Sequence, residues 1–175
     1  LWPQGVAAAG RFSLQVTVDA ASQLAEANPG GTAESNNTAE IFRVTGPDLL
    51  VRKLRVEPAG ATPIAAGGVL KVFWDDANEG DSATDAVLME SIKVSNLDTG
   101  QLILDAELAF DLLASVGGTP GRPLQAGESR QRRFDFTLPE GLRGSGRIEI
   151  SVTVDRNRAG VGSVFETNGS GNAEN

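Results

Sequence analysis

The chain has 175 residues, of which 40% are hydrophobic and 22% are charged, so it can form a packed core. It contains neither Cys nor His, which excludes disulfides, thiolate metal sites and catalytic arrangements built on those two residues. Its net charge of −8 disfavours nucleic acid and anionic membrane surfaces as partners, and no apolar run has the length of a membrane span.

The N-terminal part of the chain contains two expected strands. In 12–18 the apolar residues occupy every second position, which predicts a strand with one buried and one solvated face. A second strand is expected at 38–44. The next three residues, 46–48, predict a short, stiff linker, because Pro47 fixes its own φ angle and has no N–H to donate.

The remainder of the chain predicts a series of short strands with turn residues between them. Strand 68–75 is apolar on both faces, which is typical of a central strand, and it places Trp74 in the core. Segment 105–116 has mixed apolar spacing and predicts an extended strand followed by a short helical turn. The other expected strands are 49–57, 86–95, 101–109, 130–137, 148–154 and 163–166. Short antiparallel strands without a βαβ rhythm predict an all-β sandwich.

An internal repeat organises these strands. Residues 1–19 and 137–155 agree at an offset of 136 residues, and both segments end in Val-Thr-Val-Asp. After a four-residue difference in loop length, 24–34 matches 164–174. The period is too long for a solenoid repeat, so each unit is expected to be a whole domain. We therefore interpret 1–45 as the closing strands of one unit, 46–48 as a linker, and 49–175 as the next tandem unit without its last strand.

A family resemblance covers roughly 47–175 and the tail of the preceding copy, although 96–123 departs from the family pattern. The motifs are Pro47-Asp48-Leu49, a strand led by Gly68 and ending at Trp74, Asn78-Glu-Gly80, and an ending of Asp155 … Val164-Phe-Glu166-Thr-Asn168 … Gly171-Asn-Ala-Glu. In this order they resemble the CARDB domain, the cell adhesion related domain found in bacteria. The resemblance implies an immunoglobulin-like antiparallel β-sandwich, tandem use in large secreted or surface proteins, and no catalytic residues.

An acid-rich segment, 75–85, contains the only cofactor candidate. Its oxygen donors suit Ca²⁺, which binds six to eight oxygen ligands. Gly80 stands one position too early for the EF-hand pattern, so the alternative is a solvated turn between strands. The candidate ligands are Asp75, Asp76, Asn78, Asp81 and Asp85.

Two further groups of charged residues have competing interpretations. Acids recur in both copies of the repeat, either as an ion site or as turn residues that accept backbone hydrogen bonds, and we favour the turn. Three arginines flank an alternating strand, either as a ligand clamp or as solvated residues that discourage edge aggregation, and we favour the solvated residues. The acids are Asp19, Glu26, Asp155 and Glu166, and the arginines are Arg130, Arg132 and Arg133.

These observations predict a protein that is not an enzyme but an extracellular structural or adhesive module of a larger surface, stalk or filament protein. Its expected partners are neighbouring repeats, and segment 38–44 is a candidate for completing another subunit by strand complementation. The alternative is a module that binds carbohydrate or a protein receptor through loops at one end of the sandwich. A glycosidase using two carboxylates is a third class, which sequence alone cannot place.

Overall fold

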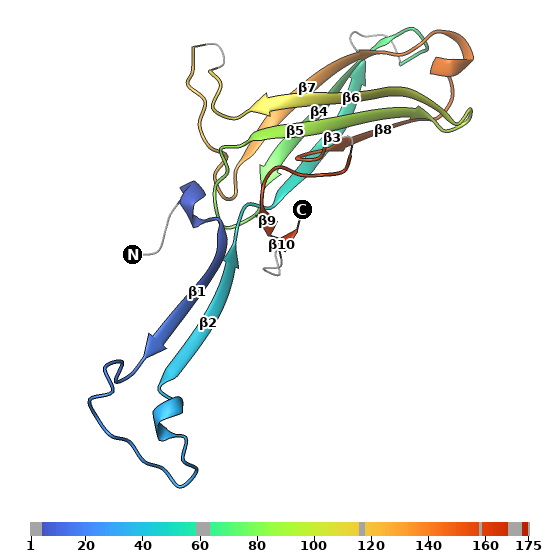
Figure 1. Ribbon diagram of the computed structural model, residues 1–175. Helices are drawn as coiled ribbons and strands as arrows, with labels where there is room; N and C mark the ends of the chain where they lie inside the picture. Colours follow the sequence, from blue (N-terminus) through green and yellow to red (C-terminus); the bar gives the residue numbers. More distant parts are fainter. Residues whose placement is uncertain (1–4, 59–63, 116–117, 158, 168–172, 175) are drawn as a thin grey trace.

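The computed structural model describes residues 5–58, 64–115, 118–157, 159–167 and 173–174 (Figure 1). Its secondary structure there consists of β-strands and short 3-10 helices, and no helix of this part of the chain could cross a membrane. The strands are β1 (Gly10–Thr17), β2 (Thr38–Thr45), β3 (Leu49–Pro58), β4 (Val69–Asn78), β5 (Val87–Asn96), β6 (Gln101–Asp111), β7 (Ser129–Thr137), β8 (Ile148–Thr153), β9 (Glu166–Thr167) and β10 (Ala173–Glu174). The 3-10 helices are η1 (Gly5–Ala8), η2 (Ala33–Ser35) and η3 (Gly141–Gly144).

Two three-stranded antiparallel sheets pack against each other as the layers of a sandwich (Figure 1). One has the order β3-β4-β7 and the other the order β6-β5-β8, so β4 and β5 are the central strands. The doubly apolar strand therefore takes the central place that its sequence predicted. The all-β antiparallel architecture is confirmed.

The core lies between the sheets because every second residue of the central strands points inward. Val72 and Trp74 of β4 and Ile92 of β5 are fully buried and form the centre of one cluster. Residues of the outer strands pack around them, which places Trp74 in the core as expected. A second cluster closes one end of the sandwich and consists of Leu49, Leu88, Leu112, Leu124, Val154 and Val164.

In segment 105–116 the strand is followed by a single hydrogen-bonded turn, in which the Ala114 N–H donates to the Asp111 carbonyl at 3.3 Å. β6 continues as a strand through Asp111 and ends in a turn, in which the Asp111 carboxylate accepts the N–H of Leu113 at 2.9 Å. The strand persists because β6 pairs with β5 from Gln101 to Asp111, with one irregularity beside Val94. This pairing outweighs the mixed local spacing.

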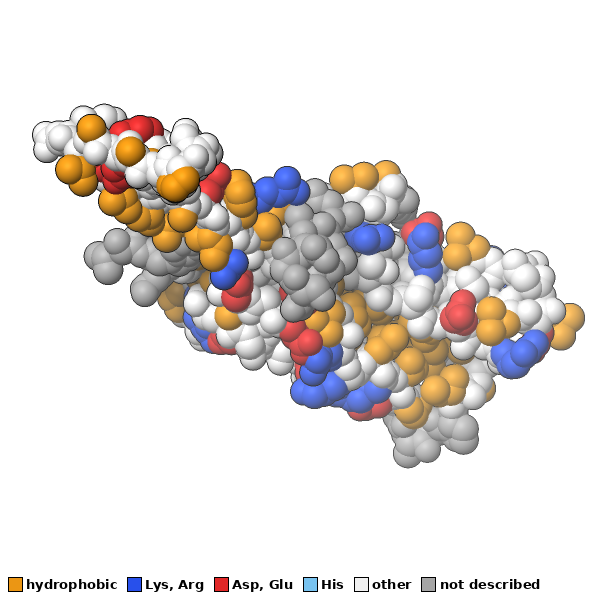
Figure 2. Space-filling view, turned by 90° about the horizontal axis from the view of Figure 1, so that it is seen from below, with side chains coloured by type: hydrophobic (Ala, Val, Ile, Leu, Met, Phe, Trp, Pro, Cys, Tyr) orange, Lys and Arg blue, Asp and Glu red, His pale blue; other side chains and the backbone are white. Residues whose placement is uncertain are grey.

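Strands β1 and β2 form a two-stranded hairpin that projects away from the sandwich (Figure 1). Its apolar side chains are largely exposed, at 55% for Leu14, 57% for Val16 and 43% for Ile41. Figure 2 shows hydrophobic side chains gathered along this projection. An isolated two-stranded hairpin is marginally stable in water, because it has no second layer to bury its apolar face.

The segment between the hairpin and the sandwich, 46–48, is built into the end of the sandwich. The Gly46 N–H donates to the Asp81 carboxylate at 2.9 Å, and the Asp81 N–H donates back to the Gly46 carbonyl at 3.1 Å. The Pro47 carbonyl accepts the Thr167 N–H at 2.9 Å. Gly46 and Pro47 are buried. Hydrogen bonds to Asp81 and Thr167 hold the segment, in addition to the restricted φ angle of Pro47.

The two copies of the repeated sequence have the same local backbone. Helices η1 and η3 stand 136 residues apart, and each begins with a glycine of positive φ, 66° at Gly5 and 67° at Gly141. The aspartates at the end of both strands adopt the left-handed conformation, with φ 46° at Asp19 and 47° at Asp155. Their surroundings differ, because β1 belongs to the projecting hairpin and β8 to the sandwich.

Candidate functional site

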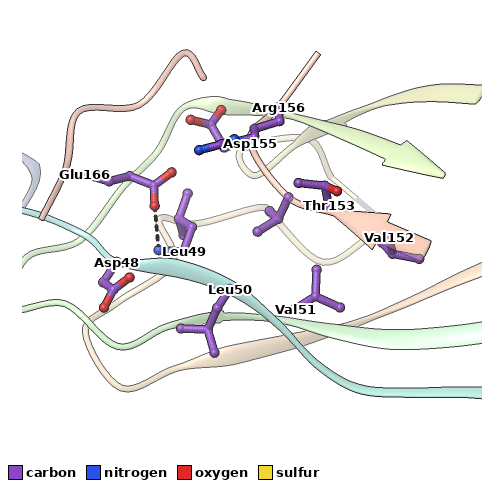
Figure 3. A pocket seen from close by; sticks show the side chains of 10 residues that line it. Asp48, Leu49, Leu50, Val51, Val152, Thr153, Asp155, Arg156 and Glu166 are labelled. Atoms are coloured by element: carbon purple, nitrogen blue, oxygen red, sulfur yellow. Dashed lines mark hydrogen bonds between the residues drawn. The ribbon is translucent and has the colours of Figure 1, made fainter. Parts of the chain in front are cut away.

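An open groove of about 260 Å³ runs between β3 and β8 (Figure 3). These two strands are the edges of their sheets on the same side of the sandwich, so no further strand of the described chain closes the space between the layers. Its apolar wall consists of Leu49 and Val51 from β3 and Val152 and Val154 from the end of β8. The groove is thus continuous with the hydrophobic core.

The polar end of the groove is formed where β9 passes the start of β3. Glu166 accepts the backbone N–H of Leu49 at 3.0 Å (Figure 3). Burial raises the pKa of Glu166 to about 7, and the nearby charges of Asp155 and Asp48 add to this shift. Arg156 partly offsets it. The sequence singled out Glu166 as a repeated acid, and in the structure its carboxylate binds the backbone at the start of β3, the first strand of the sandwich.

Asp155 closes the turn that follows β8. It is 1% exposed, and its carboxylate accepts the N–H groups of Ser163 at 3.0 Å and Val164 at 2.8 Å. Its counterpart Asp19 accepts the N–H groups of Gln23 and Leu24 in the same way, at 2.9 and 2.8 Å. Both aspartates therefore act as turn residues, as the sequence favoured.

The backbone of β8 has one paired and one unpaired edge. The Arg147 carbonyl accepts the N–H of Leu97 at 2.8 Å, so the backbone groups of Arg147 point toward β5. These groups alternate sides along an antiparallel strand. Those of Ile148, Ile150 and Val152 therefore point away from β5, toward the edge that no strand of the described chain occupies.

The calcium candidates lie in separate places rather than around one centre. The largely buried Asp75 pairs with the exposed Lys53 at 2.8 Å, whereas Asp81 binds the Gly46 N–H and Asp85 is exposed. Within the described ranges, no group of three or more acidic side chains is arranged to hold a metal ion.

Asn78 organises the turn of the acid-rich segment and is fully buried. Its side-chain oxygen accepts the N–H groups of Asp48 at 3.2 Å and Gly80 at 3.0 Å. Its amide nitrogen donates to the carbonyls of Ser82 at 2.8 Å and Leu124 at 3.1 Å. All these partners are backbone groups, so Asn78 replaces the hydrogen bonds that a turn lacks.

The last calcium candidate, Asp76, belongs to a buried charged cluster between the sheets. Asp76 and Glu90 are both 0% exposed. The indole N–H of Trp74 donates to Asp76 at 3.0 Å and lies 3.3 Å from a Glu90 oxygen. Arg132 forms two hydrogen bonds with Glu90, at 2.8 and 2.9 Å, and its Nε lies 3.5 Å from Asp76. Its guanidinium also lies 3.6 Å from the centre of the Phe110 ring.

This cluster corrects the expectation that all three arginines are solvated. The side chain of Arg132 is 21% exposed and points inward, because even-numbered residues of β7 face the core. Arg130 is also partly buried and donates to the carbonyls of Leu112 and Pro123 at 3.2 and 3.0 Å. Arg133 is the exposed member and pairs with Asp135.

Burial raises the pKa of Asp76 to about 8, and the adjacent Glu90 carboxylate contributes to the shift. The positive charge of Arg132 and the hydrogen bond from Trp74 oppose it. Sequence reasoning missed Glu90, although a signal was present. Glu90 falls on the same alternating face of its strand as Leu88 and Ile92, where a carboxylate needs a buried partner.

The chain was compared with family models, curated proteins and solved structures. The chain matches no family model, no curated protein and no solved structure.

Proposed function

We propose that this chain is a structural or adhesive repeat module of a larger extracellular surface, stalk or filament protein. Residues 49–175 would be an immunoglobulin-like, CARDB-like unit, and 1–45 the closing strands of the unit before it. The observation that carries the proposal is the β1–β2 hairpin, whose first strand matches β8 in sequence while its apolar face lies exposed.

The exposed face is that of a sandwich strand. Ile150 and Val152 of β8 pack against the core cluster around Trp74. Their counterparts at an offset of 136 residues are Leu14 and Val16, which are more than half exposed. Burying such side chains contributes about 1.5–3 kcal/mol each. A preceding unit would supply the second sheet that covers them.

The held segment 46–48 supports a spacer role. It joins the hairpin to β3 and is hydrogen-bonded to Asp81 on one side and to Thr167 on the other. Units joined through such a segment would keep a defined relative orientation, because few freely rotating residues separate them. The resemblance of 47–80 to the opening of CARDB domains supports the extracellular location.

Hydrogen exchange and proteolysis on a longer parent protein test this proposal. Amides of β1 and β2 are expected to exchange rapidly in the 175-residue chain and slowly in a protein that also contains the preceding unit. Limited proteolysis of the parent should release fragments near the 136-residue repeat length. Equal exchange of the hairpin in both proteins, without periodic fragments, would refute the repeat interpretation.

A further inference from the structure

We propose that the unpaired edge of β8 binds strand β2 of a second copy of this chain, antiparallel and with Ile41 opposite Ile150. The inference rests on the proposed function, because it treats β1 and β8 as the same element of two successive units. To the expectation that 38–44 completes another subunit, it adds the acceptor edge and the register.

The direction of the backbone groups identifies the edge. The Val18 N–H donates to the Asn37 carbonyl at 2.8 Å, so the backbone N–H and C=O groups of even-numbered residues in β1 point toward β2. Because the offset of 136 is an even number, the even-numbered residues of β8 correspond to them. The backbone groups of those residues, such as Ile150, point away from β5. The side of β8 that is open in the described chain is therefore the side that β2 occupies on β1.

The β1–β2 pairing also gives the register. Leu14 stands opposite Ile41 and Val16 opposite Ala39. Transferred by the repeat offset, Ile41 faces Ile150 and Ala39 faces Val152. Ile41 and Ala39 would then share a face with the β8 residues that pack on the core, next to the groove between β3 and β8. A slip by one residue would turn both side chains into solvent.

The other sheet edges carry features that discourage pairing, whereas β8 does not. β3 has a bulge between Arg52 and Arg55, and β6 is irregular opposite Val94. β7 carries three arginines within Ser129–Thr137. β8 is regular and contains no Pro, Lys or Arg. Bulges and cationic residues are the usual means of blunting an edge, so β8 is the edge suited to accept a strand.

The donor strand is available at low cost. β2 lies in the exposed hairpin, where Ile41 is 43% and Phe42 is 67% exposed, and its pairing with β1 adds no second layer. Exchanging β1 for β8 keeps the number of strand pairs and adds contacts to a packed sandwich. Because the donor and acceptor are different surfaces, the contact is heterologous, and repeating it builds an open chain of copies.

Engineered cysteines test the register in the full-length chain, which contains no cysteine of its own. Chains with Glu40→Cys are mixed with chains with Ser151→Cys under mild oxidation. Both positions are exposed, and they face each other in the proposed register. Opposite residues of a non-hydrogen-bonded pair have Cα atoms about 4.5 Å apart, which a disulfide spans. A mixed disulfide dimer is the expected product.

The matched control is Glu149→Cys mixed with Glu40→Cys, which is two residues out of register. Such diagonal neighbours lie about 7–8 Å apart, so we expect about tenfold less mixed dimer. Equal yields from the two mixtures would overturn the register, and no mixed dimer at high concentration would overturn the pairing. Neither result would contradict the proposed repeat, which the exchange and proteolysis experiments test separately.

A second variant asks whether β2 is the donor. Gln15 and Glu40 are opposite each other in the hairpin, so Gln15→Cys with Glu40→Cys in one chain locks β2 onto β1. Sedimentation should show self-association of the reduced form and its loss after oxidation. Equal association of the locked and reduced forms would exclude β2 as the bound strand and overturn the proposal.

Discussion

Strands β1 and β8 carry the same alternating pattern and the same turn residues, yet one is exposed and the other lies in a sandwich. The inward-facing Ile150 packs on the Trp74 cluster, whereas its counterpart Leu14 is 55% exposed. Alternation therefore specifies a strand and its apolar face. Burial of that face depends on whether a second sheet lies opposite.

The same comparison predicts two levels of stability within one chain. The sandwich holds the buried clusters and the charged group around Glu90, and the hairpin holds neither. Regions with few buried contacts open at lower free energy than the core. Four tests of this difference follow, from the largest expected effect to the smallest.

Arg132→Met removes the positive partner of Glu90, which stays buried at 0% exposure. Removing one partner of a buried ion pair costs about 3–5 kcal/mol of unfolding free energy. Chemical denaturation followed by Trp fluorescence measures the loss. Arg133→Met is the control, because its pair with Asp135 is solvent-exposed and its loss should leave the unfolding free energy nearly unchanged. Similar losses in both variants would contradict the buried role of Arg132.

The second effect is a dependence of stability on pH that originates in the sandwich. The folded protein raises the pKa of Asp76 from 3.8 to about 8, so the folded state retains a proton that the unfolded state releases. The contribution to stability is complete below pH 3.8 and is lost as pH rises toward about 8.

Asp76→Asn should flatten this profile, because Asn carries no proton to lose. Glu166, with a pKa raised to about 7, contributes in the same direction, so Glu166→Gln should remove part of the remaining slope. Denaturation curves between pH 4 and pH 8 give the measurement. An unchanged slope in Asp76→Asn would show that this group does not titrate in that range.

The third test compares equivalent apolar residues. Ile150→Ala should cost about 2 kcal/mol, because Ile150 packs against the core cluster. Leu14→Ala should cost less than about 0.5 kcal/mol in this chain, since surface changes are usually small. Equal costs from thermal unfolding would mean that the hairpin and the sandwich bury their apolar faces equally.

The smallest expected effect concerns the two turn aspartates. Asp155→Ala leaves the N–H of Val164 without its acceptor in a buried turn, at a cost of about 1–2 kcal/mol. Asp19→Ala removes the same kind of bond at an exposed turn, where water replaces it, so a smaller change is expected. Denaturant midpoints of the two variants give the comparison, and a larger loss in Asp19→Ala would reverse it.

Local sequence determined the parts of the fold that depend on local chemistry. Period-two alternation predicted the strands, the doubly apolar run predicted a central strand with Trp74 in the core, and the repeated Asp predicted a turn. These signals work because side-chain alternation and turn geometry involve residues that are close in the chain.

Only the tertiary structure decided how distant charges combine. Asp76, Glu90 and Arg132 come from three different strands, and they form one buried cluster because β4, β5 and β7 place inward positions at the same depth. Two of the candidate calcium ligands, Asp75 and Asp76, are neighbours on β4, and alternation sends them to opposite faces of the sheet. Spacing along a strand determines the face of each carboxylate, but packing between sheets determines its partner.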